Sequence, residues 1–333
     1  MFKTLLTGAA LTLSALTLAL PAHAQYPERN IQAVVPWGAG GATDNVMRSL
    51  APHVEKELGT KLVITNRPGG TALIGGTYVK QQKPNGYTLL LGAENPQLYQ
   101  VMGLADFDYS DFYPVNIIAQ NTVLIAVRED SPYKTMDDLL KAIRESNGTI
   151  RMGSTGVGAL QNTVFSMFKA VDNLEVREVN FQGEGPIVTA LLGGHIDFTP
   201  IAFAAAKEMV AAGKFRALAV FAKEEIPELP GVEPIVKALP ALERYLPWGP
   251  FYGVFAHKDT PEDVKQVLVN AYANAVNSPE YQAFLKNFGA RTLNIHGDEA
   301  YAFLKRWQSV TTWSMYDAKA VSISPETVGI PKP

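Results

Sequence analysis

The stretch from Val34 to Leu50, "VVPWGAGGATDNVMRSL", predicts an apolar strand that runs through a cluster of glycines into a helix. Glycine lets the backbone turn sharply and lets a ligand approach the main-chain N–H groups. The helix that follows directs the positive end of its dipole toward the same loop. The stretch therefore predicts a strand–loop–helix unit that binds an anion.

The spacing of these glycines differs from that of the known nucleotide-binding loops. A dinucleotide loop has the pattern G-x-G-x-x-G and an acidic residue about 20 positions later. Here the pattern is G-x-G-G-x-x-D, and the next predicted strand ends in Asn66 and Arg67. No Gly-Lys-Ser/Thr follows the glycines, as a Walker motif would require. We therefore expect an anion smaller than a nucleotide.

Strands and helices alternate along the chain in two successive blocks, which predicts an α/β fold with two domains. A long β-rich run, Pro114–Asp130, leads out of the first block, and a Pro-rich segment leads back to an apolar strand that starts at Phe251. The first domain is expected to comprise residues 25–122 and 250–333, with the closing helices returning to it. The second comprises residues 123–249.

The first 24 residues resemble a secretory signal peptide. Lys3 precedes an apolar stretch, Leu5–Leu20, and "PAHA" then places an Ala-x-Ala pattern before Gln25. The alternative is a membrane anchor, but about 16 apolar residues are short for a span of ~20. Cysteine is absent, so an exported chain would have no disulfides. We expect cleavage after Ala24 and a location in the periplasm.

Composition and motifs exclude several classes of function. With 47% hydrophobic and 18% charged residues, the chain is expected to fold around sizeable cores. A net charge of −3 without basic runs argues against nucleic acid as a partner. The five His residues are scattered, and neither H-E-x-x-H nor G-x-S-x-G occurs. We expect a monomer with no catalytic residues, no metal ligands and no cofactor.

Two further glycine-containing loops join a predicted strand to a predicted helix in the second block. They are "GSTGVGAL", Gly153–Leu160, and "FQGEGP", Phe181–Pro186. Each alone is compatible with an ordinary strand-to-helix turn. Open α/β sheets, however, bind ligands at the carboxyl ends of their strands. Three such loops beside one crossover therefore favour a common ligand cleft.

In their order along the chain, several stretches resemble the solute receptors of tripartite tricarboxylate transporters, the Bug family. These are "YPERNIQAVVPWGAGGATDNVMRSLA", "NRPGGTALIGG", "KPNGYTLLLGA", "FDYSDFYPV", "FQGEGPIVTALLGGHIDF", "AAGKFRALAVF" and "ELPGVEP". The resemblance covers nearly the whole mature chain. It implies a two-domain clamp of the periplasmic binding protein type with two crossover strands. It also implies a small organic acid as ligand and integral membrane permease subunits as partners.

The resemblance further implies that backbone amides and waters of two facing loops hold the ligand carboxylate. The first loop is Trp37–Asp44, the second is Ser154–Ala159, and the segment from Phe181 to Gly185 borders the pocket together with Asp197. The residues assigned to ligand binding are Trp37, Gly38, Ala39, Gly40, Gly41, Thr43, Asp44, Ser154, Thr155, Gly156, Gly158, Ala159, Phe181, Gly183, Glu184 and Asp197.

Three of these positions depart from the family pattern. Ala159 stands where a hydroxyl residue is frequent, Trp37 replaces a smaller Phe, and Glu184 adds a negative charge at a position that is usually small. Glu184 either points to solvent or contacts a cationic or hydroxyl group of the ligand. Trp37 either stacks on an aromatic ligand or only packs at the rim.

The sequence therefore favours a non-catalytic receptor that captures a small carboxylate and hands it to a tripartite transporter. Two alternatives stay open. An exported hydrolase or isomerase would need a positioned base and nucleophile, for which no pair is found. A receptor that signals to a histidine kinase would look the same in sequence.

Overall fold

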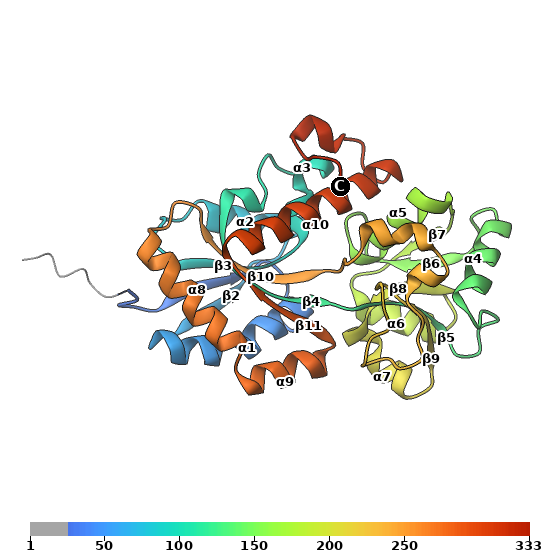
Figure 1. Cartoon of the computed structure of the whole chain (residues 1–333), viewed down its shortest axis with the longest axis horizontal. Helices are drawn as coiled ribbons and strands as arrows, with labels where there is room; N and C mark the ends of the chain where they lie inside the picture. The colour runs from blue at the N-terminus through green and yellow to red at the C-terminus, as the bar shows by residue number, and fades with distance from the viewer. Residues whose placement is uncertain (1–25) are drawn as a thin grey trace, which may run out of the picture.

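A computed structural model describes residues 26–333, so the predicted signal peptide lies outside the described residues. The chain forms two mixed sheets that lie side by side (Figure 1). The first has the order β11-β4-β10-β3-β1-β2 and the second the order β7-β6-β8-β5-β9. The two mixed sheets with their helices confirm the predicted α/β architecture.

The first sheet is built from both ends of the described chain. Its strands are β1 (Ile31–Val35), β2 (Leu62–Asn66), β3 (Thr88–Ala93), β4 (Phe112–Asn121), β10 (Phe251–His257) and β11 (Ala290–Ile295). β1 pairs in parallel with β2 and β3, whereas β10 pairs antiparallel with β3 and β4. Its helices are α1 (Ala42–Leu58), α2 (Leu73–Lys80), α3 (Tyr99–Met102), α8 (Glu262–Val276), α9 (Pro279–Phe288) and α10 (Gly297–Asp317).

The second sheet comes from the middle of the chain. Its strands are β5 (Val123–Arg128), β6 (Arg151–Ser154), β7 (Arg177–Asn180), β8 (Phe198–Ala202) and β9 (Phe215–Val220). Its helices are α4 (Met136–Glu145), α5 (Leu160–Asp172), α6 (Glu184–Leu192) and α7 (Phe203–Ala211). The sequence did not predict α4, although Thr135 and Asp138 form a capping box at its start.

The chain crosses between the sheets twice. The long β-rich run is two strands, because β4 ends at Asn121 in the first sheet and β5 begins at Val123 in the second. The return path passes through the 3₁₀ helix η4 (Pro240–Tyr245) into β10. The carboxyl end of β4 and the amino end of β10 are thus adjacent, and both lie at the boundary between the two sheets (Figure 1).

Alternating side chains of β1 face two different cores, as the period of two in a strand requires. Ile31, Ala33 and Val35 pack with α1, α8 and α9 on one face of the first sheet. Val34 faces the opposite core, which continues without a break into the second sheet.

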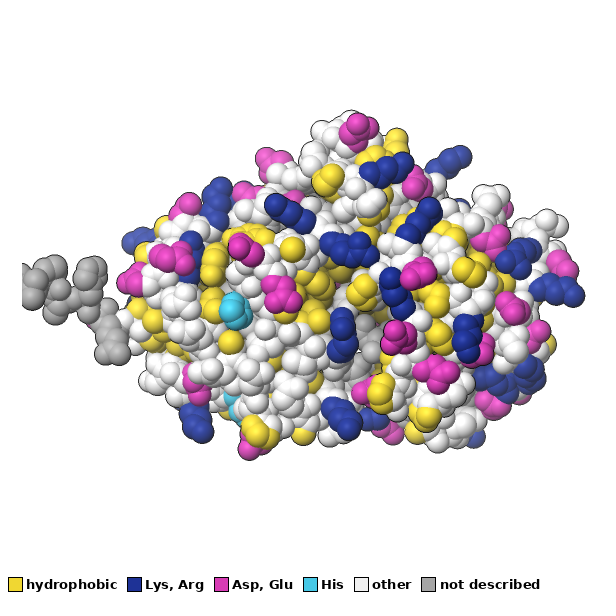
Figure 2. All heavy atoms as spheres, in the orientation of Figure 1, with side chains coloured by type: hydrophobic (Ala, Val, Ile, Leu, Met, Phe, Trp, Pro, Cys, Tyr) yellow, Lys and Arg dark blue, Asp and Glu magenta, His cyan; other side chains and the backbone are white. Residues whose placement is uncertain are grey.

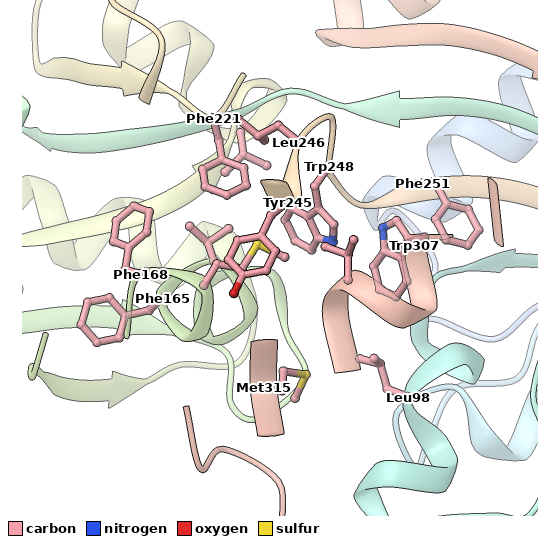
Figure 3. Close-up of a cluster of buried hydrophobic side chains, with 14 of the residues drawn as sticks. Leu98, Phe165, Phe168, Phe221, Tyr245, Leu246, Trp248, Phe251, Trp307 and Met315 are labelled. Atoms are coloured by element: carbon pink, nitrogen blue, oxygen red, sulfur yellow. The ribbon is translucent and has the colours of Figure 1, made fainter. Parts of the chain in front are cut away.

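Aromatic side chains carry this second core across the boundary (Figure 3). Trp248, on the return path, stacks on Trp307 of α10 with ring centroids 5.9 Å apart. Phe221, which follows β9, meets Trp248 edge-on at 5.8 Å. The indole nitrogen of Trp248 donates to Thr311 Oγ1 at 2.8 Å. The two sheets therefore share a continuous apolar core as well as the two crossings.

The three closing helices differ in what they contact. α8 and α9 pack on the first sheet, whereas α10 lies along β4 and also against α5 of the second. Contact with α10 and η4 buries α5 on nearly all sides, including the polar side chains Gln161, Asn162 and Ser166. On the face shown in Figure 2, positive and negative side chains are intermixed.

Candidate functional site

A cavity of about 190 Å³ lies where the two sheets meet. It is lined by Trp37, Ala42, Thr43, Ala93, Glu94, Asn95, Asn121, Thr155, Ala159, Leu160, Gln161, Glu184, Ala202, Pro250 and Tyr252. These residues come from the loops after β1 and β6, from the carboxyl ends of β3, β4 and β8, from the start of β10, and from the first turns of three helices. The cavity is therefore at the position where open α/β sheets bind ligands.

Two long helices begin at this cavity. Ala42 and Thr43 form the first turn of α1, while Leu160 and Gln161 form that of α5. The first amides of a helix have no partner inside the helix, and the helix dipole adds positive potential there. A carboxylate in the cavity can thus accept hydrogen bonds from the first amides of α1 and α5, which belong to opposite sheets.

The glycine loop before α1 holds its own shape instead of lining the cavity. Gly40 N donates to Asp44 Oδ2 at 2.8 Å, and Gly41 N donates to Gly38 O at 3.3 Å. Gly40 has a φ of +78°, which suits glycine. Gly38, Ala39, Gly40 and Gly41 are exposed and are not among the lining residues. The donors that face the cavity come from the helix turn that follows the glycines.

Asp44 is buried beneath this loop and fixes it. Its carboxylate accepts hydrogen bonds from Arg48 Nε, Asn66 Nδ2 and the Gly40 amide, and Asn66 also donates to the carbonyl of Trp37. Burial alone would raise the pKa of Asp44, but these hydrogen bonds, led by that of Arg48, outweigh burial and lower the pKa. Asp44 positions Trp37 and the first turn of α1 without lining the cavity itself.

The second loop is divided in the same way. Thr155 and Ala159 line the cavity, and Thr155 Oγ1 donates to Gln161 Oε1 at 3.2 Å. Ser154 is buried and accepts from Gly156 N at 3.1 Å. Gly158 N donates to Asn162 Oδ1 at 3.4 Å. Ser154, Gly156 and Gly158 thus shape the loop, while Thr155 and Ala159 face the cavity.

Of the remaining assigned residues, the structure brings only Glu184 to the cavity. Gly183, with a φ of +114°, is the N-cap of α6 and sets Glu184 at the first helical position. Phe181 packs against the apolar core of the second sheet. Asp197 is not among the residues that line the cavity: it precedes β8 and lies at the amino end of the parallel strands. There it pairs with Arg151 at 2.6 Å.

Glu184 lines the cavity and is partly buried. Its Oε1 accepts a hydrogen bond from the Ala202 amide at 3.0 Å. Burial raises the pKa of its carboxyl to about 7, and this single hydrogen bond only partly opposes the effect of burial. Glu184 therefore changes charge near neutral pH.

Sequence reasoning missed a second acid, Glu94, which directly follows β3. Burial raises the pKa of its carboxyl to about 7, and the charge of Glu184 adds to this increase, while its own amide and that of Phe251 act against it. Asn121 and Tyr252 complete this end of the cavity, with Asn121 Nδ2 donating to the Tyr252 hydroxyl at 2.6 Å. The missed signal was a polar pair, Glu94-Asn95, at the end of an apolar strand.

The cavity offers hydrogen-bond donors and acceptors but no sign of metal chemistry. Within residues 26–333, no group of three or more His, Asp or Glu residues is placed to hold a metal ion. None of the helices in that range combines the length and apolarity needed to cross a membrane.

Comparison with known proteins identifies the family to which the chain belongs. The sequence profile of the tripartite tricarboxylate transporter family receptor matches residues 46–310. A UPF0065 protein of Bordetella pertussis is 28% identical over 300 residues, which are 88% of this chain and 91% of that protein.

Solved structures of similar sequence have the same fold. The periplasmic binding protein BugD is 26% identical with a TM-score of 0.73, over 92% of this chain and all of that chain. MatC from Rhodopseudomonas palustris with bound malate shares the fold at 24% identity and a TM-score of 0.74, over 88% of this chain and all of that one. The chain therefore belongs to the tripartite tricarboxylate transporter family of receptors, which are periplasmic solute-binding proteins rather than enzymes.

Proposed function

We propose that this receptor captures a small organic carboxylate in the cavity between its sheets and delivers it to the permease subunits of a tripartite transporter. The observation that carries the proposal is the convergence of the first turns of α1 and α5 on one cavity of about 190 Å³. MatC, which has the same fold, was solved with malate, itself a small carboxylate.

The size of the interaction fits capture and release. A charge-assisted hydrogen bond contributes about 1.5–3 kcal/mol. Two or three of them, together with apolar contact at Trp37 and Leu160, give roughly −8 kcal/mol, which corresponds to a micromolar Kd. Such a ligand is retained at low concentration and still leaves readily.

The predicted signal peptide and the periplasmic location of the family's receptors both support a periplasmic location for this chain. We infer that the mature receptor begins after Ala24 and works in the periplasm. N-terminal sequencing of the exported protein tests the cleavage site directly.

A calorimetric titration of the mature receptor with small organic acids tests the binding. We expect at least one acid to bind with a micromolar Kd. Ala159→Leu fills the cavity from the N-cap of α5 and should lower that affinity at least about 100-fold. Ala212→Leu, an equal enlargement on the exposed end of α7, is the matched control. Unchanged affinity in a folded Ala159→Leu variant contradicts the proposal.

Delivery needs a separate experiment. Proteoliposomes that contain the permease subunits should take up the radiolabelled ligand only when the receptor is added. Uptake at the same rate without receptor would remove the transport part of the proposal.

A further inference from the structure

The lining residues include hydrogen-bonding groups of opposite character. The donors include the first-turn amides of α1 and α5 and the side chain of Gln161. The carboxyl groups of Glu94 and Glu184 lie close enough for the charge of one to raise the pKa of the other, and Tyr252, which both influence, is hydrogen-bonded to Asn121. No Lys or Arg is among the lining residues that the structure describes, so neither glutamate has a cationic side chain beside it in the cavity.

Two buried side-chain atoms at this site are without a hydrogen-bond partner in the described structure, and each points to a ligand group. Gln161 is 1% exposed, and its Nε2 is an unused donor, since its Oε1 is the atom that accepts from Thr155. Asn121 is 7% exposed, and its Oδ1 is an unused acceptor, since its Nδ2 is the atom that donates to Tyr252. Buried polar groups normally have partners, so both atoms indicate that a ligand supplies them.

The two requirements differ in kind. Gln161 Nε2 needs an acceptor, which a carboxylate oxygen supplies beside the amides of α5. Asn121 Oδ1 needs a donor, and the adjacent Glu94 and Glu184 favour a donor that also carries positive charge. A second carboxylate beside Glu94 and Glu184 would be repelled by their charged forms and would require them to take up protons, whereas an ammonium group pairs with the charged forms directly.

We propose that the ligand is an amino acid in the general sense: a small molecule whose carboxylate meets the α1 and α5 turns and whose primary or secondary ammonium group meets Glu94, Glu184 and Asn121. This inference rests on the proposed carboxylate-receptor function and specifies its ligand. A quaternary ammonium does not satisfy it, because such a group has no N–H for Asn121 Oδ1. The small volume limits the chain between the two charged groups to a few carbons.

The neighbouring charges leave this assignment intact. Tyr252 is the other titratable side chain among the described lining residues, and burial raises its pKa, so that it remains neutral. On α1, Asp44 and Arg48 are paired with each other. On α7, Lys207 Nζ donates a hydrogen bond to the carbonyl of Asn287. The negative potential at the ammonium end therefore comes from Glu94 and Glu184.

Matched ligand sets test the inference by calorimetry. Each set contains an amino acid, its deaminated acid and its dicarboxylate isostere: glycine, acetate and malonate; β-alanine, propionate and succinate; 4-aminobutyrate, butyrate and glutarate. Alanine with propionate and lactate adds an α-substituted set, and propylamine represents an amine without a carboxylate. We expect the tightest amino acid to bind at least about tenfold more tightly than its deaminated and dicarboxylate counterparts.

Isosteric variants then assign the ammonium to its partners. Glu94→Gln and Glu184→Gln should each weaken the amino acid about tenfold and leave the deaminated acid within about threefold. Glu208→Gln, at an exposed glutamate of α7, should change neither. A second readout is proton exchange: at pH 7 the amino acid should release protons from the two glutamates, whereas a dicarboxylate should cause uptake. Calorimetric titration in buffers of different ionisation enthalpy shows whether protons are released or taken up on binding.

The outcomes separate this inference from the function on which it rests. If deaminated acids or dicarboxylates bind as tightly as the amino acids, or if the Gln variants weaken all of them equally, the ammonium assignment is overturned and the carboxylate receptor stands. If propylamine binds and no carboxylate does, the proposed function is overturned. If no compound binds, both are overturned.

Discussion

Glu94 and Glu184 line one cavity from the two different sheets, and the charge of Glu184 helps to raise the pKa of Glu94 to about 7. Glu184 accepts a hydrogen bond from the Ala202 amide, and the main-chain amides of Glu94 and Phe251 lower the pKa of Glu94 without offsetting its burial. Two acids with such pKa values in an otherwise neutral pocket are a costly arrangement without a ligand. Perturbed acids of this kind concentrate at functional sites.

The first prediction concerns stability and pH in the ligand-free receptor. Both glutamates have a folded-state pKa of about 7, above the ordinary value of 4.5. The contribution of the two glutamates to the free energy of unfolding is therefore fully present below about pH 4.5 and is lost as the pH rises through 7. We expect the free energy of unfolding to fall by on the order of 2–4 kcal/mol from pH 5 to pH 8 because of this pair.

Urea unfolding at the two pH values measures this loss, with the Glu94→Gln/Glu184→Gln double variant as reference. The pKa values of Asp44 and Asp197 are lowered, so those groups lose their contribution only in more acidic solution and do not interfere. An equal loss in the wild type and the double variant would show that the pair does not titrate in this range.

The second prediction concerns Asp44. Asp44→Ala removes the acceptor that holds Gly40, Asn66 and Arg48 together. We expect a loss of about 2–4 kcal/mol in the free energy of unfolding, and at least about tenfold weaker ligand binding because the first turn of α1 is no longer fixed. Chemical denaturation and calorimetry measure the two effects.

Glu233→Ala is the control for Asp44→Ala, because it removes an exposed i,i+4 ion pair with Lys237. It should change the free energy of unfolding by less than about 0.5 kcal/mol. Full ligand affinity in a folded Asp44→Ala variant would show that the loop does not depend on this carboxylate.

The third prediction separates Asp197 from the ligand site. Asp197 accepts hydrogen bonds from the amide and guanidinium of Arg151, at the end of β6 and β8 that faces away from the cavity. Asp197→Asn should lower the free energy of unfolding by about 1–2 kcal/mol and leave the ligand Kd within about twofold. A tenfold or larger change in Kd at unchanged fold would return Asp197 to the site.

The fourth prediction concerns the aromatic contact between the sheets. Trp248→Ala removes the stacking on Trp307 and the edge-on contact with Phe221, and should cost about 3–5 kcal/mol. Since this contact restrains rotation about the two crossings, the ligand-free variant should have a larger radius of gyration than the wild type. Small-angle scattering measures this, and identical curves would show that the indole does not restrain the sheets.

Sequence reasoning predicted the architecture well because periodicity and strand-end loops are local signals. The strand at Ile31, the glycine loop before α1 and the long run that became β4 and β5 all carried such a signal. α4 was missed in spite of its capping box. The contact between α10 and α5 was not predicted, because it depends on tertiary packing that no local pattern records.

The site was predicted less completely, for the same reason. Trp37, Thr43, Thr155, Ala159 and Glu184 were assigned from the resemblance and do line the cavity. Glu94, Asn121 and Gln161 were missed because no local pattern shows that they lie near one another in the fold, and only the pairing of β3, β4 and β10 brings the first two together.

The most direct test of the account is a crystal structure of the mature receptor with its tightest small carboxylate. The account predicts carboxylate oxygens about 2.7–3.1 Å from first-turn amides of both α1 and α5, with the other end of the ligand at Glu94 and Glu184. A larger hollow of about 850 Å³ lies elsewhere, lined by Val101, Met102, Val157 and Tyr316 among others. Ligand density there, or a ligand in the central cavity that touches only one of the two helix turns, would contradict the account.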